Sequence, residues 1–227
     1  MEARQVGARE ADVAPAAEAP VATGWTPGNP SALGAAAFAL TTFVLSMFNT
    51  GLVGNPLHQG SVLGLMLFYG GVAQLLAGMW EFRTGNTFGA LLFSSFGGFW
   101  LAVWYVLTQT SLVTLTPSGV SLFLYAWAIF AALMFVASLR TTGAVTATLL
   151  LLTITLFILA IGWANLSSPG TSLVGRAALH LSGTNGTIKL GGWFGIVTAA
   201  AAWYVAFAAV MASTFGRDVL PVYPLNR

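Results

Sequence analysis

The chain has 227 residues, of which 57% are hydrophobic and only 6% are Asp, Glu, Lys or Arg, and its formal net charge is +2. A soluble domain carries about 25% charged residues, so this composition excludes a soluble globular protein and predicts a membrane protein. The basic residues are dispersed, which excludes a nucleic-acid-binding surface, and the lack of cysteine excludes disulfides and thiolate metal sites.

The first 28 residues differ from the rest of the chain. They are rich in Ala, Glu and Pro, show no apolar period, and lack the continuous apolar core of a signal peptide. We expect residues 1–28 to be a disordered cytosolic tail. Residues 29–213 are expected to form a six-helix transmembrane domain, and residues 214–227 a short cytosolic carboxy-terminal tail.

Six apolar stretches follow, each long enough to cross a bilayer. Hydrocarbon about 30 Å thick needs about 20 apolar residues in a helix. Asn29 is suited to cap the first helix and Pro30 to open it. The sequence therefore predicts an all-α membrane protein with spans at about 31–54, 61–80, 88–107, 119–139, 144–166 and 191–213, and with its longest connection at 167–190.

The number of spans places both termini on the same side of the membrane. Cytoplasmic loops carry an excess of Lys and Arg. The side of the termini is richer in these residues, which predicts cytoplasmic termini for a protein of the plasma (inner) membrane. The residues on that side are Arg4, Arg9, Arg83, Arg140, Arg217 and Arg227, and those opposite are Arg176 and Lys189.

No charged residue lies deep in a predicted span. Charges there usually mark ion paths or proton relays, so a carboxylate-driven pump, a voltage sensor and an intramembrane metalloenzyme are disfavoured, and we expect no metal and no other cofactor. Neutral polar residues are present, and those of the first span share one helix face. They either bond their own backbone and join helices, or line a path for a small anion. The candidates are Thr41, Thr42, Ser46, Asn49 and Gln74.

The last span carries small residues at four-residue spacing, namely Gly191, Gly195 and Ala199. Small residues let helix backbones approach closely in a membrane. The pattern predicts tight packing of this span, either within the chain or at a subunit interface.

Two charged residues, Glu81 and Arg83, fall between the second and third predicted spans, beside Asn86 and Thr87. Either they are solvated or paired loop charges, or they form a mouth that orients a passing carboxylate. The two histidines, at positions 58 and 180, are solitary and do not make a metal site.

Several separated motifs occur in a recognisable order. They are 29–34 (Asn-Pro-Ser-Ala-Leu-Gly), 41–42 (Thr-Thr), 68–74 (Phe-Tyr-Gly-Gly-Val-Ala-Gln) continuing to Glu81, 85–89 (Gly-Asn-Thr-Phe-Gly) and 215–221 (Phe-Gly-Arg-Asp-Val-Leu-Pro). In these motifs the chain resembles the acetate uptake transporter family, the succinate-acetate permeases. The resemblance implies a homohexamer in the lipid bilayer, with a path in each protomer for acetate and related small monocarboxylates, in some members succinate. By the motifs, Asn29, Pro30, Glu81, Asn86 and Thr87 belong to the family pattern and the mouth.

The resemblance also implies where the path is narrowest. The family forms its constriction from a Phe, a Tyr and a Leu, which fall on Phe38, Phe96 and Leu152 of this chain. The tyrosine hydroxyl is therefore missing, and the ring is wholly apolar. Ala209 and Ser213 stand where the sixth span of the family can carry acidic residues, so coupling through such acids is not expected.

These features favour a passive or weakly coupled path for small carboxylates. One alternative is a proton-coupled symporter, in which the proton travels on the undissociated acid or through groups at the mouths such as Glu81 or His58. Another is a membrane sensor or scaffold that binds a carboxylate without moving it. An enzyme is disfavoured because the sequence shows no nucleophile with its base, metal cluster or nucleotide-binding loop.

Overall fold

The computed structural model describes residues 27–53, 59–108, 116–166 and 185–225. In this part of the chain, six helices are long and apolar enough to cross a membrane. This confirms the predicted all-α architecture with six spans. The predicted amino-terminal tail lies almost wholly outside the described residues, as do Arg4, Arg9, Arg176, Arg227 and both histidines.

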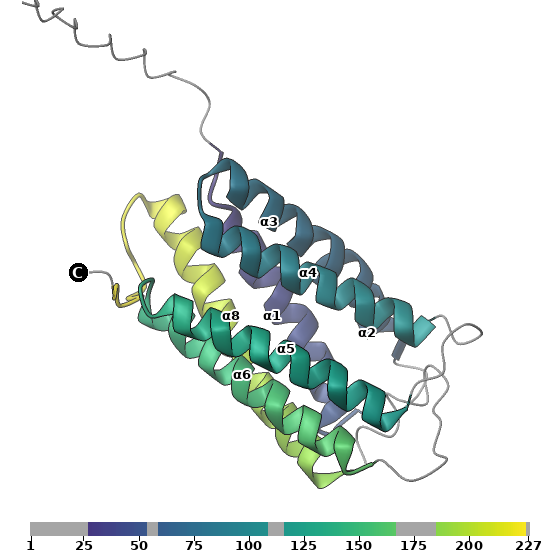
Figure 1. Ribbon diagram of the computed structural model, residues 1–227. Coiled ribbons are helices and arrows are strands. Elements are labelled where there is room, and N and C mark those ends of the chain that lie inside the picture. Colours follow the sequence, from purple (N-terminus) through teal and green to yellow (C-terminus); the bar gives the residue numbers. More distant parts are fainter. Residues whose placement is uncertain (1–26, 54–58, 109–115, 167–184, 226–227) are drawn as a thin grey trace, which may run out of the picture.

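The helices form one elongated bundle (Figure 1). The second span is continuous but has three parts, because a π-helical segment, with its wider i→i+5 hydrogen bonding, separates two α-helical ones. The elements are α1 (Pro30–Asn49), α2 (Gln59–Gly64), η2 (Leu65–Ala73), α3 (Gln74–Arg83), α4 (Thr87–Thr108), α5 (Pro117–Ser138), α6 (Gly143–Ala164) and α8 (Gly186–Phe215).

Capping residues explain where the helices begin. The Asn29 side chain accepts a hydrogen bond from the Ser31 backbone N–H at 3.0 Å, and Pro30 is the first helical residue, as predicted. Asn185 accepts from the backbone N–H groups of Thr187 and Ile188. The last helix therefore begins at Gly186, earlier than the predicted start at 191. Residues 186–190 of the predicted connection 167–190 belong to this helix.

The packing order of the helices differs from their order in the chain. α1 packs against α8 on one side and against η2 and α3 on the other; α6 packs against both α8 and α5, and α4 packs against η2 and α3. The backbones of α4 and α5 approach each other closely at few positions. Large side chains therefore have to fill the space between α4 and α5.

Glycines allow α8 to lie directly on its neighbours. A Cβ atom at Gly195 would meet the Ser46 hydroxyl, and one at Gly192 would lie 2.6 Å from the backbone nitrogen of Thr50. At Gly191 it would lie 2.6 Å from a methyl carbon of Leu159. The small-residue pattern of the last span therefore serves packing within the chain, which confirms the first of the two alternatives.

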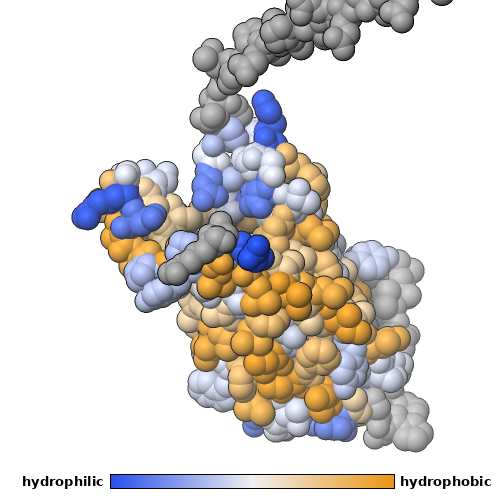
Figure 2. Space-filling view, turned by 60° about the vertical axis from the view of Figure 1, so that its left-hand side comes forward, coloured by the Kyte–Doolittle hydropathy of each residue, from blue (hydrophilic) through white to orange (hydrophobic). Residues whose placement is uncertain are grey.

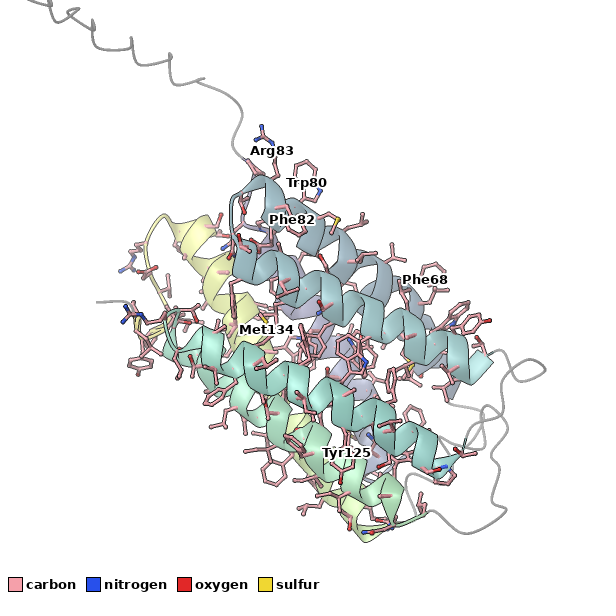
Figure 3. The ribbon with its side chains drawn as sticks, viewed as in Figure 1. Phe68, Trp80, Phe82, Arg83, Tyr125 and Met134 are labelled. Atoms are coloured by element: carbon pink, nitrogen blue, oxygen red, sulfur yellow. The ribbon has the colours of Figure 1, made fainter. Side chains whose placement is uncertain are left out.

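The outer surface suits a bilayer. Figure 2 shows a broad apolar zone, with hydrophilic residues gathered toward the end of the bundle where the α3–α4 turn lies. Phe68, Trp80 and Phe82 are exposed and point away from the bundle (Figure 3). The protein is therefore an integral membrane protein, with side chains of this zone facing lipid or another subunit.

The carboxy-terminal segment packs against the turn between α5 and α6. The backbone N–H of Gly143 donates to the Tyr223 carbonyl at 2.7 Å, and that of Ala144 donates to the Val222 carbonyl at 3.2 Å. The N–H of Leu225 donates in turn to the Thr141 carbonyl at 2.9 Å. Backbone carbonyls of the segment thus satisfy N–H groups in the first turn of α6, which have no partner within the helix.

Candidate functional site

A small cavity lies inside the bundle. Its volume is about 50 Å³, measured as the space open to the centre of a water molecule. About 10–15 Å³ measured in this way holds one water, so the cavity has room for a solute of a few heavy atoms. It is lined by Ala35, Phe38, Gln74, Leu92, Phe93, Phe96, Val145, Thr148, Leu149, Leu152, Ala202 and Val205.

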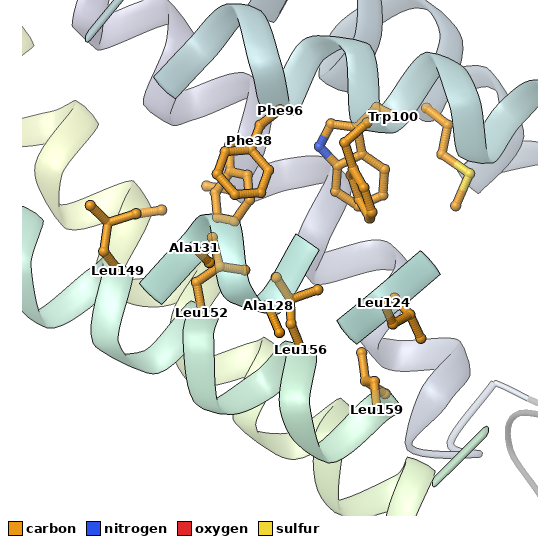
Figure 4. Packing of buried hydrophobic residues seen from close by; sticks show 14 of the residues in the cluster. Phe38, Phe96, Trp100, Leu124, Ala128, Ala131, Leu149, Leu152, Leu156 and Leu159 are labelled. Atoms are coloured by element: carbon orange, nitrogen blue, oxygen red, sulfur yellow. The ribbon is translucent and has the colours of Figure 1, made fainter. Parts of the chain in front are cut away.

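The structure brings together the three residues of the expected constriction. Phe38 of α1, Phe96 of α4 and Leu152 of α6 line the same cavity, and all three are buried. The ring centroids of Phe38 and Phe96 are 5.8 Å apart in an edge-to-face arrangement, and Leu152 lies opposite them (Figure 4). These side chains form an apolar ring in the middle of the bundle. That they form the narrowest part of a path stays a prediction.

Phe96 is held in place from the side of α5. Its ring centroid lies 5.6 Å from that of Trp127 and 5.6 Å from that of Phe130. Trp127 also contacts Phe99, one turn from Phe96 on α4, with 5.2 Å between centroids. These aromatic rings fill the space between α4 and α5. Sequence analysis did not single out Trp127 or Phe130, although their three-residue spacing predicts a shared helix face.

Gln74 is the amide of the cavity. It directly follows the π-helical segment, is 1% exposed, and its Oε1 accepts no hydrogen bond within the part of the chain that the structure describes. An unpaired buried acceptor costs about 1–3 kcal/mol. The other polar residue of the lining, Thr148, donates its hydroxyl to the Ala144 carbonyl at 2.8 Å. Gln74 thus keeps a hydrogen-bonding atom that the protein itself does not use.

The polar residues predicted on the first span lie between helices. Thr41 donates to the Ala37 carbonyl at 2.9 Å and faces Gly70, while Ser46 faces Gly195 and Asn49 faces Gly192. Thr42 is buried and its hydroxyl has no partner among the described residues. None of the four lines the cavity. Of the alternatives, joining helices accounts for Thr41, Ser46 and Asn49, and a role in a path stays a prediction.

Glu81 is not a loop residue, which corrects the prediction of a solvated or paired loop charge. It lies in the last turn of α3 and is 1% exposed. Its carboxylate accepts hydrogen bonds from the Ser31 hydroxyl, from Asn86 Nδ2 at 2.8 Å and from the Thr84 hydroxyl at 3.3 Å. The prediction was wrong because the helix continues beyond Trp80 to Arg83, and the tight turn into α4 then folds uncharged donors around the carboxylate.

The other motif residues belong to the same corner of the protein, where the start of α1 meets the turn between α3 and α4. Asn86 Oδ1 accepts from the Gly89 backbone N–H at 3.0 Å, which caps α4, and Thr87 is the first residue of that helix. Asn29 and Pro30 begin α1 beside it, through the bond between Ser31 and Glu81. Arg83 is exposed and points outward (Figure 3). The motif therefore ties the start of α1 to the turn between α3 and α4.

Known proteins resemble the chain over most of its length. The model of the GPR1/FUN34/yaaH family matches residues 12–227. Acetate permease A of Emericella nidulans is 39% identical over 206 residues, which are 86% of this chain and 65% of that protein. The succinate-acetate/proton symporter SatP of Escherichia coli (strain K12) is 34% identical over 197 residues, covering 86% of this chain and 94% of that protein.

A solved structure supports the same assignment. The structure of the bacterial acetate channel SatP superimposes with a TM-score of 0.73 at 31% identity, covering 87% of this chain and 99% of the other. These relatives are named for transport rather than for an enzymatic reaction. The chain belongs to the GPR1/FUN34/yaaH family, which confirms the resemblance that its separated motifs indicated.

Proposed function

We propose that this protein transports acetate and related small monocarboxylates through a path in each protomer. Succinate is a further candidate substrate. The observation that carries the proposal is the apolar ring of Phe38, Phe96 and Leu152 beside a cavity of solute size. The names of the relatives supply the substrate class. A simple carboxyl titrates at about 4 to 5, so near neutral pH acetate is mostly an anion that needs a protein path.

The ring acts as the barrier of this path. An apolar constriction cannot replace the water that a carboxylate loses, and unpaired burial of a charge is costly. A solute therefore crosses the ring quickly only if neighbouring polar groups compensate on either side. Gln74 is the one amide among the lining residues, and it compensates a solute in the cavity only when its side chain turns toward the solute.

The cavity lies on one side of the ring. Its lining residues on α1, α4 and α6, such as Ala35, Leu92 and Val145, precede the ring residues of the same helices. These three helices all begin at the end of the bundle that carries Arg83, Arg140 and Arg217 (Figure 1). The excess of arginine favours a cytoplasmic location for this end, so the cavity faces the cytoplasm and the ring separates it from the outside.

The assembly proposed here is a homohexamer in the plasma (inner) membrane with both termini in the cytoplasm. Exposed apolar side chains, including Leu122, Leu133 and Phe207, cover the outside of the bundle and are available for contact with lipid or other copies. Crosslinking of the purified protein in mild detergent would report the number of subunits.

Transport and the role of the ring are tested together in proteoliposomes. Labelled acetate should enter vesicles that contain the protein faster than protein-free vesicles. Leu152→Ala and Phe96→Ala should each change this protein-dependent rate, because each shortens a side chain of the barrier. Thr153→Val is the matched control, since its hydroxyl donates to the Leu149 carbonyl of its own helix at 2.7 Å and it does not line the cavity. If both alanine variants transport like the unchanged protein, the assignment of the ring is wrong.

The same vesicles separate the alternatives. Accumulation of acetate above equilibrium under an imposed proton gradient would support proton coupling, which the name of the symporter relative makes the second candidate. Accumulation that survives Glu81→Gln and His58→Ala would remove those residues from the coupling. Saturable binding without any protein-dependent flux would instead indicate a sensor or scaffold.

A further inference from the structure

The three members of the apolar ring are supported in different ways. Phe38 and Leu152 belong to α1 and α6, and both of these helices pack closely along α8. Phe96 belongs to α4, whose backbone approaches that of α5 closely at few positions. On the side of α5, the position of Phe96 therefore depends on side chains rather than on contact between helix backbones.

Two side chains of α5, Trp127 and Phe130, provide this support, and we call them the α5 aromatic pair. Their ring centroids lie 5.5 Å apart, and each lies 5.6 Å from the centroid of Phe96, so the three rings form a nearly equilateral triangle. Aromatic rings attract each other at centroid distances of about 4.5–7 Å. The pair is partly exposed and Phe96 is buried, so the pair lies between Phe96 and the outside of the bundle.

The α5 aromatic pair contacts the ring without belonging to the wall of the cavity. Phe96 lines the cavity and meets Phe38 edge to face at 5.8 Å, whereas neither Trp127 nor Phe130 is a lining residue. A phenylalanine side chain in a close-packed interior keeps its rotamer because its neighbours occupy the alternative positions. With a smaller residue at 127 or 130, the ring of Phe96 can turn toward α5 and away from Phe38, which widens the opening.

The neighbouring positions of α5 carry small residues instead. Ala128 and Ala131 each directly follow one member of the pair, are fully buried, and lie near Leu152 in Figure 4. The methyl side chains allow α5 and α6 to pack closely. α5 therefore places small side chains near Leu152 and large aromatic rings against Phe96, so the size of the pair sets how far Phe96 can move.

We propose that Trp127 and Phe130 are positioning residues that hold Phe96 toward Phe38 and thereby limit the size of the carboxylic acids that pass the ring. The inference rests on the proposed function and assigns its size selectivity to two residues that do not line the cavity. Acetate passes, and acids that branch at the carbon next to the carboxyl group are excluded. A smaller residue at either position admits the branched acids.

The test compares the uptake of two acids by proteoliposomes that contain the full chain. Acetate is the small acid and 2-hydroxyisobutyrate is the branched one, whose polar hydroxyl keeps its passage through the lipid low. The measured quantity is the selectivity ratio, which is the protein-dependent uptake rate of 2-hydroxyisobutyrate divided by that of acetate, with protein-free vesicles as the background. One methylene group in an apolar site changes discrimination by about tenfold or more, so Trp127→Ala and Phe130→Ala should each raise this ratio at least about fivefold.

Three controls distinguish positioning from a general loss of packing. Trp127→Phe keeps an aromatic ring against Phe96 and should leave the selectivity ratio unchanged. Tyr125→Ala removes an aromatic side chain from the same helix, but one that contacts Phe157 of α6 at 6.1 Å between centroids, and it should also leave the ratio unchanged. In a protein that already carries Phe96→Ala, Trp127→Ala should no longer raise the ratio, because the residue through which it acts is gone.

An unchanged selectivity ratio in folded Trp127→Ala and Phe130→Ala proteins overturns the inference and leaves the proposed function intact, since acetate uptake continues. An equal rise in Tyr125→Ala, or a full rise from Trp127→Ala in the absence of Phe96, also overturns it. If the alanine variants do not fold, Trp127→Leu and Phe130→Leu keep an apolar side chain of intermediate size and should raise the ratio at least about twofold; an unchanged ratio in both overturns the inference. Absence of protein-dependent acetate uptake by the unchanged protein overturns the proposed function as well.

Discussion

Two adjacent glycines of α4 provide a matched test of the packing that forms the cavity. A Cβ atom at Gly97 would lie 2.7 Å from the backbone nitrogen of Leu75 and 2.9 Å from its Cα atom, whereas nothing lies within 4 Å of one at Gly98 in the described part of the chain. Gly97→Ala therefore forces α3 and α4 apart, and Gly98→Ala does not. Both substitutions add the same methyl group to the same helix.

The expected difference in stability can be worked out from these distances. Ordinary contact begins at 3.4 Å, so the helices have to separate by about 0.7 Å at Gly97. Overpacking of this kind costs about 1–3 kcal/mol, and the atom in the way is backbone, which cannot rotate aside. The gain in helix propensity from Gly to Ala, at most about 1 kcal/mol, is common to both variants and cancels in the comparison. Gly97→Ala should thus be less stable than Gly98→Ala by about 1–3 kcal/mol.

The assay is unfolding of both purified variants in mixed micelles by titration with sodium dodecyl sulfate, alongside acetate flux in vesicles. Gly97 adjoins Phe96 and Leu75 adjoins Gln74, so a shift at this contact also moves two walls of the cavity. Acetate flux should therefore change in Gly97→Ala and stay unchanged in Gly98→Ala. Equal unfolding midpoints for the two variants would refute the reasoning, since they would mean that α3 and α4 do not touch here.

Other predictions concern the corner at Glu81, the ring and the carboxy-terminal segment. Glu81→Ala leaves the buried donors of Ser31 and its neighbours unpaired and should lower the free energy of unfolding by at least about 2 kcal/mol, measured by the same titration; a smaller loss than in Glu81→Gln would contradict this. Phe96→Tyr adds a hydroxyl to the ring and should raise acetate flux roughly fivefold, the equivalent of one hydrogen bond of about 1 kcal/mol; lower flux in a folded variant would speak against an apolar barrier. Deleting residues 218–227 removes the carbonyl that the Gly143 N–H donates to and should cost about 1 kcal/mol of stability; an unchanged midpoint would mean that the segment does not dock.

Hydropathy predicted the existence of all six spans, since a continuous stretch of about 20 apolar residues is the length that a helix needs to cross the bilayer. Their ends were less predictable because polar residues also belong to helices. Glu81 is helical and buried because donors from α1 and from the α3–α4 turn surround it, and neither neighbour can be inferred from hydropathy. The π-helical segment before Gln74 carries no sequence signal that we recognise.

At the candidate site, too, features within one helix could be predicted from the sequence, whereas contacts between helices could not. Periodicity placed Thr42, Ser46 and Asn49 on one face of α1, but not the glycines of α8 that this face meets. Which helices become neighbours depends on packing in three dimensions, and α1 lies beside α8, the helix farthest from it in the chain. The ring positions came from the family resemblance. That Gln74 lines the cavity, and that its Oε1 has no partner among the described residues, depends on how several helices pack and could not be predicted from the sequence.

A carboxylic acid could cross this ring as the anion or as the neutral acid, and the two forms carry energetic costs of different origin. Protonating a carboxyl that titrates at about 4.5 costs about 3.4 kcal/mol at about pH 7. Burying a bare carboxylate costs several kcal/mol even after the protein relaxes and water penetrates, and far more in a dry apolar site. None of the residues that line the cavity beside the ring is Lys, Arg or His, so no cation there offsets that penalty. The cost of protonation shrinks by about 1.4 kcal/mol for each pH unit that the pH falls, so passage of the neutral acid predicts an acetate flux that rises steeply with acidity, whereas passage of the anion does not.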